Sequence, residues 1–170
     1  MARIKPFVGL LISPTSVEAV QCSRSESGEV SFDFYHHLAT VEPLVDEDGD
    51  MANHEALGDV LAQLWKETGI KTRDVVLGLS GKRAIARLVP LPRIPANQLH
   101  QVVLSEAEQY TLFRDEEPLV DYFTVDTDDE STTVFYAAAS QRLVNAYKAA
   151  LKHAKLKLLA VDIAQYASLR

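Results

Sequence analysis

The sequence predicts an α/β chain made of two units: a mixed sheet with helices, then a small α+β unit. Apolar and alternating runs at the front predict an antiparallel meander of three strands, followed by a helix and a further strand. Beyond residue 81 the expected order changes to strand, helix, hairpin, helix and strand. We therefore place the first unit at residues 1–81, with 161–170 returning to it, and the second unit at residues 82–160.

Composition limits the classes of protein to consider. The 170 residues are 47% hydrophobic and 24% charged, which are ordinary globular proportions and exclude a disordered or fibrous chain. The single cysteine, Cys22, excludes a disulfide-stapled scaffold, and we expect it to be inert core. A net charge of −7 argues against a nucleic-acid partner. No apolar run approaches the ~20 residues of a membrane span, so we expect a cytoplasmic protein.

In the first unit, short runs bounded by turn residues predict the strands. The expected meander comprises strands at 7–12, 17–23 and 30–40, a tight turn at Pro14-Thr15 and a hairpin turn at 27–29. Asn53 suits the N-cap, and Gly69 the C-terminal stop, of a helix ending at residue 68. A buried strand at 74–79 and a glycine turn at 80–82 complete this unit.

The second unit begins with an expected strand at 84–91. Three prolines between 90 and 95 predict that this stretch lies outside any sheet or helix, and Pro95 suits the first turn of a helix ending near Tyr110. The remaining expected elements are a hairpin of 119–126 with 132–139, a helix capped by Ser140, and a strand at 156–163. A last helix begins near residue 162. We therefore expect either a longer natural protein or a half-length relative of one.

Several stretches resemble phosphate- or metal-binding motifs but lack residues that those motifs require. Residues 76–82 are not a P-loop, because Val76 stands where the first glycine is required and Arg83 where Ser or Thr is required. The acidic run 46–50 lacks the later glycine and glutamate of a calcium loop, and the five histidines have no metal-ligand spacing. We expect no metal site. Four lysines around the last full helix predict a solvated face or a weak contact with an anionic membrane: Lys148, Lys152, Lys155 and Lys157.

Residues 8–20 form an apolar strand, a tight turn and a returning strand, which resembles the first phosphate loop of the actin–Hsp70–sugar kinase superfamily. In that loop an Asp orients the metal ion and its water. Here Leu11 stands at the Asp position and Ser13 at the glycine position. Pro14, which precedes Thr15, has no backbone N–H to offer a phosphate. We therefore expect ATP and magnesium binding to be lost or weak, and no catalysis.

Further blocks resemble the N-terminal half of the PilM family, the actin-like proteins of type IV pilus assembly. The blocks are the first loop 8–20, Gly-Ile-Lys-Thr at 69–72, the proline-rich stretch 89–95, Ser-Glu-Ala-Glu-Gln-Tyr at 105–110, Leu-Val-Asp-Tyr at 119–122 and Ala-Val-Asp-Ile at 160–163. The resemblance covers nearly all 170 residues, which is about half of a full PilM. It implies an actin-like (ribonuclease H-like) first subdomain and a small inserted subdomain of the FtsA/PilM type.

The resemblance also implies a function. PilM proteins lie at the cytoplasmic face of the inner membrane and bind the short N-terminal tail of the bitopic protein PilN, in a groove between the two subdomains. We therefore expect a non-catalytic adaptor with a PilN-like partner. The candidate groove residues are Arg87, Pro90, Arg93, Glu106, Gln109 and Tyr110. The two arginines suit a carboxylate or carbonyl, and Tyr110 suits an anchor. Their alternative roles are that Arg93 braces the proline loop and that Tyr110 is core.

Two other functions stay open. One is an actin-like, ATP-binding filament protein, against which the missing first-loop Asp argues. The other is the related actin-like cytoplasmic subunit of type II secretion, which the sequence does not separate from a pilus protein. A homo-oligomer, and whether residue 170 is a natural end, are also left open.

Overall fold

The computed structural model describes residues 6–25, 30–46, 50–51, 53–79, 84–110, 113 and 116–167. Its contacts divide the chain into two compact units, one of Met1–Gly81 with Asn145–Arg170 and one of Lys82–Val144. The second boundary lies earlier than the expected residue 160. Residues 145–160 group with the first unit, because the last strand of the chain pairs with a strand there.

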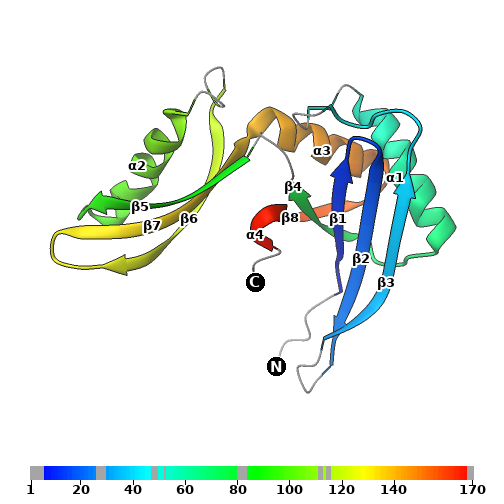
Figure 1. Cartoon of the computed structure of the whole chain (residues 1–170), viewed down its shortest axis with the longest axis horizontal. Coiled ribbons are helices and arrows are strands. Elements are labelled where there is room, and N and C mark those ends of the chain that lie inside the picture. Colours follow the sequence, from blue (N-terminus) through cyan, green and yellow to red (C-terminus); the bar gives the residue numbers. More distant parts are fainter. Residues whose placement is uncertain are drawn as a thin grey trace. The chain divides into compact units, whose positions relative to one another are not determined.

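The first unit is built on a five-stranded mixed sheet (Figure 1). Its strands are β1 Val8–Ser13, β2 Ser16–Arg24, β3 Val30–Ala39, β4 Asp74–Leu79 and β8 Lys157–Ile163. Their order is β3-β2-β1-β4-β8. The first three strands form the expected antiparallel meander, whereas β4 runs parallel to both β1 and β8. The prediction of a mixed sheet is confirmed.

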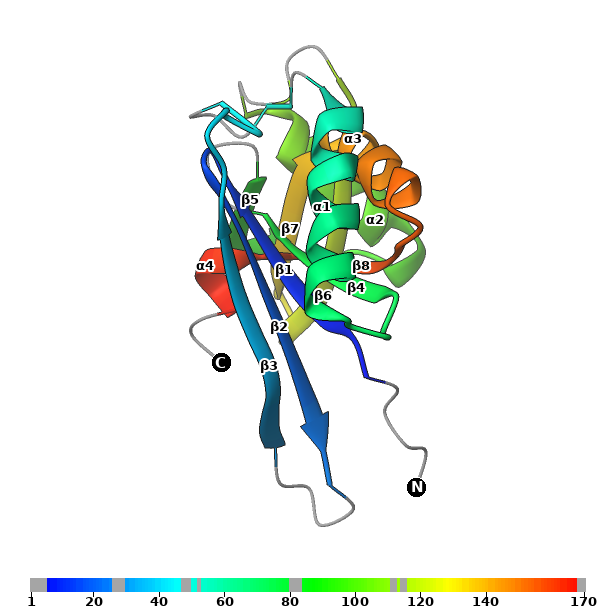
Figure 2. The same ribbon diagram turned by 90° about the vertical axis from the view of Figure 1, so that its right-hand side faces the viewer.

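Two helices cover one face of this sheet (Figures 1 and 2). They are α1 His54–Thr68 and α3 Gln141–His153. The Asn53 side chain accepts hydrogen bonds from two first-turn amides, and Gly69, at φ 70°, ends α1 in the left-handed conformation that glycine adopts readily. Ser140 caps α3 by accepting from the Leu143 amide at 3.1 Å. The expected caps at the start of both helices, and the expected end of α1 at Gly69, are confirmed.

The core of the first unit lies between the sheet and these helices. Alternate residues of β1 and β4 are buried, which matches the period of two in a strand with one covered face. The helices contribute their apolar stripes, including Leu57, Leu61 and Leu64 of α1 and Leu151 of α3. Cys22 is half-buried rather than core, so that expectation was wrong. The four lysines around α3 are exposed.

The second unit is a three-stranded antiparallel sheet with one helix on one face (Figure 1). Its elements are β5 Ala84–Pro92, α2 Ala96–Glu108, β6 Pro118–Thr127 and β7 Ser131–Ser140, and the strand order is β5-β7-β6. The buried residues between sheet and helix are Leu91, Leu99, Val103, Ala107, Phe113, Val134, Tyr136 and Ala138. The expected hairpin and helix are therefore present.

The proline-rich stretch departs from expectation. Pro90 and Pro92 lie within β5, paired with Thr133 and Ser131 of β7, although we expected the strand to end at residue 91 and the proline-rich stretch to lie outside the sheet. The physical reason is that β5 is an edge strand. Two residues of the same parity turn their nitrogens to the same side, and at an edge that side needs no ladder hydrogen bond. Pro95 precedes α2 as expected.

Some expected features lie outside the described residues. These are the hairpin turn 27–29, the glycine turn 80–82 and the end of the last helix, of which α4 Ala164–Ala167 is seen. Within the described part of the chain, no helix combines the length and apolar character needed to cross a bilayer.

Candidate functional site

The first candidate site is the turn between β1 and β2, where Ser13 pairs with Ser16. The backbone of the turn is engaged by the segment after β3. The Pro14 carbonyl accepts from the Leu44 amide at 2.7 Å, and the Thr15 carbonyl accepts from the Thr40 amide at 2.8 Å. The turn is therefore fixed by its carbonyls, and proline adds no donor that an anion would require.

Leu11, which the resemblance to an actin-like phosphate loop places at the position of the acid, lies in β1. Its side chain is half-buried, and a Cβ added at Gly78 of β4 would lie 3.6 Å from Leu11 Cδ1. The same point is 3.5 Å from the Cβ of Ala164, at the start of α4. Leu11 thus packs in an apolar setting against the neighbouring strand. Among the residues that the structure describes, no group of three or more His, Cys, Asp or Glu is placed to hold a metal ion.

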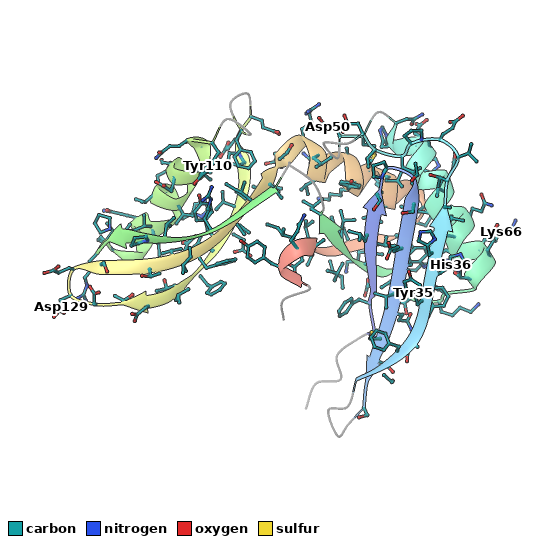
Figure 3. The ribbon with its side chains drawn as sticks, viewed as in Figure 1. Tyr35, His36, Asp50, Lys66, Tyr110 and Asp129 are labelled. Carbon is teal, nitrogen blue, oxygen red and sulfur yellow. The ribbon has the colours of Figure 1, made fainter. Side chains whose placement is uncertain are left out.

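The second candidate site is in the second unit, at the C-terminal end of α2 (Figure 3). The Arg87 guanidinium, from β5, lies over the ring of Tyr110 with its central carbon 5.2 Å from the ring centroid. This is a cation–π contact. One turn back on the helix, Glu106 accepts a hydrogen bond from the Gln109 side chain at 3.2 Å. Four of the six predicted groove residues therefore lie together.

Tyr136 of β7 forms the floor of this cluster and was not predicted. It pairs with Arg87 across the sheet and is completely buried. Burial first, then the nearby Tyr110 and Glu106, raise the pKa of the Tyr136 hydroxyl, and Arg87 opposes this rise. Its hydroxyl has no hydrogen-bond partner of ordinary geometry among the described residues. Only the β5–β7 register, which the sequence does not specify locally, places Tyr136 beside Arg87.

Among the residues that the structure describes, this buried hydroxyl lacks a hydrogen bond of ordinary geometry, and this gives a stability prediction. Leaving a buried hydroxyl unpaired costs about 1–3 kcal/mol, so Tyr136→Phe is expected to stabilise the protein, by about 1 kcal/mol. Thermal unfolding should show a melting temperature higher by about 2–4 °C. Tyr122→Phe, at a half-buried position on the same face, is the control and should change little. A lower melting temperature for Tyr136→Phe would mean that the hydroxyl is hydrogen-bonded in solution.

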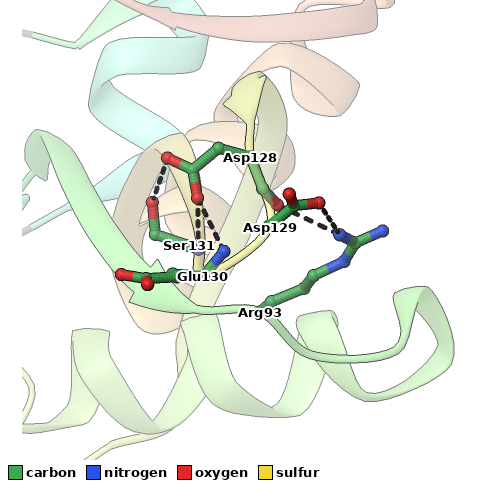
Figure 4. Close-up of polar contacts among 5 residues, drawn as sticks. All are labelled: Arg93, Asp128, Asp129, Glu130 and Ser131. Atoms are coloured by element: carbon green, nitrogen blue, oxygen red, sulfur yellow. Dashed lines mark hydrogen bonds and ion pairs between the residues drawn. The ribbon is translucent and has the colours of Figure 1, made fainter.

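Arg93 follows β5 at the other end of the second unit, and its side chain lies beside the turn of the β6–β7 hairpin (Figure 4). Its Nη1 donates to the Asp128 carbonyl at 3.2 Å and is 3.4 Å from Asp129 Oδ1. Its backbone amide donates to the Glu130 carbonyl at 3.0 Å. Arg93 therefore ties the end of the proline-rich stretch to the hairpin turn, which is the bracing role considered as the alternative.

The hairpin turn has its own carboxylate clasp. Asp128 accepts from the amides of Glu130 and Ser131, at 2.8 and 2.7 Å, and from the Ser131 hydroxyl at 3.1 Å. These hydrogen bonds to the charged form, with a smaller effect of Arg93, lower the pKa of Asp128. These hydrogen bonds within the turn hold its shape, and the contact with Arg93 adds to them.

The predicted groove residues are thus divided along β5. Arg87 and Arg93 are six residues apart, roughly 20 Å along an extended strand at about 3.3 Å per residue. Pro90 is exposed on the strand between them. The cluster of Arg87, Glu106, Gln109 and Tyr110 is the compact part of the set, and we call it the α2-end cluster.

The mixed sheet, its covering helices and the strand–turn–strand opening define an actin-like protein. The chain belongs to the PilM family: the family described as type IV pilus assembly protein PilM matches residues 9–170. No curated protein matches the chain in sequence.

Two solved structures show the likeness in three dimensions. A chain of the "PilM-PilN type IV pilus biogenesis complex" superposes with a TM-score of 0.83 at 26% identity, over 99% of this chain and 50% of that one. The cytoplasmic domain of EpsL, an inner-membrane component of the type II secretion system of Vibrio cholerae, gives a TM-score of 0.54 at 16% identity. That match covers 92% of this chain and 57% of EpsL, and shows the fold alone. The chain therefore spans about half the length of the first of these relatives.

Proposed function

We propose that the chain is a non-catalytic adaptor of type IV pilus assembly that binds the short cytoplasmic N-terminal tail of a PilN-like inner-membrane protein. It acts in the cytoplasm and is held at the inner membrane through that partner. The observation that carries this proposal is the match over 99% of the chain to a structure of a PilM–PilN complex.

The α2-end cluster supports peptide binding chemically. Arg87 is an exposed, permanently charged donor whose planar group suits a carboxylate or a main-chain carbonyl. The Tyr110 ring beneath it offers an apolar surface with a polar tip, the character of a binding anchor. Glu106 and Gln109 supply an acceptor and an amide on the same helical turn. These groups recognise polypeptide without any metal ion or nucleotide.

A labelled tail peptide tests the proposal. Its sequence is taken from the N-terminal tail of a PilN-like protein, and fluorescence anisotropy follows its titration with the full chain. We expect saturable binding at micromolar concentration, and none for a scrambled tail of the same composition. If the tail and its scrambled form bind alike, or neither binds to folded protein, the adaptor proposal fails.

The proposed loss of nucleotide binding has its own test. A ligand present at 100 times its dissociation constant stabilises a protein by about 2.7 kcal/mol, which is a shift of several degrees in melting temperature. Leu11 has no carboxylate for a metal ion, and Pro14 has no backbone N–H for a phosphate. We therefore expect no shift in melting temperature with millimolar Mg-ATP. The control is magnesium with a non-nucleotide polyphosphate. A shift specific to ATP would instead favour the ATP-binding filament hypothesis.

A further inference from the structure

A second surface of the second unit has the character of a docking face. In the three-stranded sheet, even-numbered residues of β7 face α2 and odd-numbered ones face the other side. No described element of the same unit covers that other side (Figure 1). Antiparallel sheets with one solvated face normally carry polar residues there. This face does not follow that pattern, as its central row shows.

The central row is apolar and crosses all three strands. Leu88 of β5 pairs with Phe135 of β7, which pairs with Phe123 of β6. The two phenylalanine rings are 5.2 Å apart, yet Leu88 is 59% exposed and Phe123 is 57% exposed. The neighbouring rows place alanines on the face that carries this central row. In β6, the exposed Leu119 also lies on this face, paired with Ala139. An apolar patch that is continuous over three strands indicates an interaction surface.

The β6 side of this face is acidic. Asp121 and Asp126 share it with Phe123, by the register of β6 with β7. Each Asp accepts its neighbour's backbone amide at 2.9 Å through Oδ1, and both side chains are exposed, where a cation can reach them. Between residues 116 and 141 the chain has no Lys or Arg and these acids: Glu116, Glu117, Asp121, Asp126, Asp128, Asp129 and Glu130. The negative charge on and near β6 therefore favours a partner with a positively charged surface.

From these observations we infer that the sheet face of Leu88, Phe135 and Phe123, with Asp121 and Asp126 at its β6 side, docks an amphipathic helix of a basic partner protein. Three strands at about 4.8 Å spacing make a face of about 14 Å, close to the 10–12 Å diameter of a helix. The opposite face already holds one helix, α2, in this way. The helix's apolar stripe covers the central row, and its Lys or Arg residues meet the two aspartates.

The charge also disfavours other occupants. A second copy of the chain would bring the same acids together on both sides of a two-fold interface, where like charges repel. An anionic membrane surface would be repelled for the same reason. This inference concerns the face opposite α2 and is independent of the adaptor proposal, which concerns the α2-end cluster.

A pair of probe peptides tests the inference with the full chain. The first is an amphipathic helix of about 18 residues made of leucine and lysine, long enough to be helical in water, and the second has glutamate in place of lysine. Anisotropy titrations at low salt are expected to show binding of the lysine peptide only. Equal binding of the glutamate peptide, or no binding of either, would overturn the inference.

Variants then locate the site. Asp121→Asn with Asp126→Asn keeps both Oδ1 acceptors and removes the charges, and should weaken binding about fivefold, as expected for two exposed ion pairs. Phe123→Ser with Leu88→Ser should weaken it more than about tenfold. Phe32→Ser and Glu67→Gln, at exposed positions of the first unit, are the matched controls and should leave binding unchanged. Circular dichroism confirms that each variant is folded.

Two further outcomes would overturn the inference. One is that the control substitutions weaken the lysine peptide as much as the face substitutions do, since binding would then follow net charge alone. The other is that light scattering shows a dimer of the wild type which Phe123→Ser with Leu88→Ser converts to a monomer. In that case the face would be a self-interface.

Discussion

Replacing Tyr110 by Ala is expected to weaken the affinity for a PilN-like tail more than tenfold. In the structure the ring is half-buried, with the Arg87 guanidinium stacked over it. Truncation removes both the apolar surface that a peptide side chain would cover and the platform that orients Arg87. Anchor residues of this kind typically contribute about 2 kcal/mol or more to binding, which is roughly a 30-fold change in dissociation constant. Anisotropy titration of the labelled tail measures it.

Two further variants separate binding from stability. Tyr122 is another half-buried tyrosine of the same core, in ring contact with His100 instead of Arg87. Tyr122→Ala should therefore lower the melting temperature to a similar extent and leave tail affinity unchanged. Tyr110→Phe keeps the ring and should bind nearly as the wild type does. Equal affinity losses for Tyr110→Ala and Tyr122→Ala would show that only the fold is affected, and that Tyr110 is not an anchor.

Replacing Gly58 by Ala is expected to destabilise the first unit, although alanine is the better helix former. Gly58 is buried in α1, and an added Cβ would lie 2.7 Å from Cδ2, 2.8 Å from Cβ and 2.9 Å from Cγ of His153 in α3. Helix propensity alone favours alanine by about 1 kcal/mol, whereas overpacking a well-packed contact costs about 1–3 kcal/mol. We expect the clash to exceed the gain, because a Cβ and a ring both have to move.

Denaturant unfolding shows directly whether Gly58→Ala lowers or raises the free energy of unfolding. Ala62→Gly, at an exposed site in the same helix, measures the propensity effect without a clash and should cost about 1 kcal/mol. His153→Ala still leaves a Cβ in place, so His153→Gly is the variant that makes room. In a double-mutant cycle, Gly58→Ala should be less harmful in the His153→Gly background. A stabilising Gly58→Ala in the otherwise unchanged chain would contradict this close packing of α1 and α3.

The elements predicted best are those with local signals. Asn53 and Gly69 mark the two ends of α1, and Ser140 marks the start of α3, because capping depends on residues within one helical turn. The antiparallel meander was also predictable from alternation and short turns. The family resemblance, confirmed by the match over residues 9–170, supplied the actin-like fold, which local signals do not give.

The features that were missed depend on contacts between distant segments. Pro90 and Pro92 could enter β5 only because β5 is an edge strand, and an edge is defined by the order of strands in space. The boundary near residue 144 reflects the parallel pairing of β8 with β4, some 80 residues away in sequence. The burial of Tyr136 beneath Arg87, and the row of Leu88, Phe135 and Phe123, follow from the β5–β7 and β6–β7 registers.

Hydrogen exchange with and without the bound tail tests most directly whether the α2-end cluster holds the partner. The adaptor account predicts slower exchange at the C-terminal end of α2 and along β5, with the β1–β2 turn unchanged. If the tail binds while these two segments exchange as in the free protein, the peptide is held elsewhere and the account of this site is wrong.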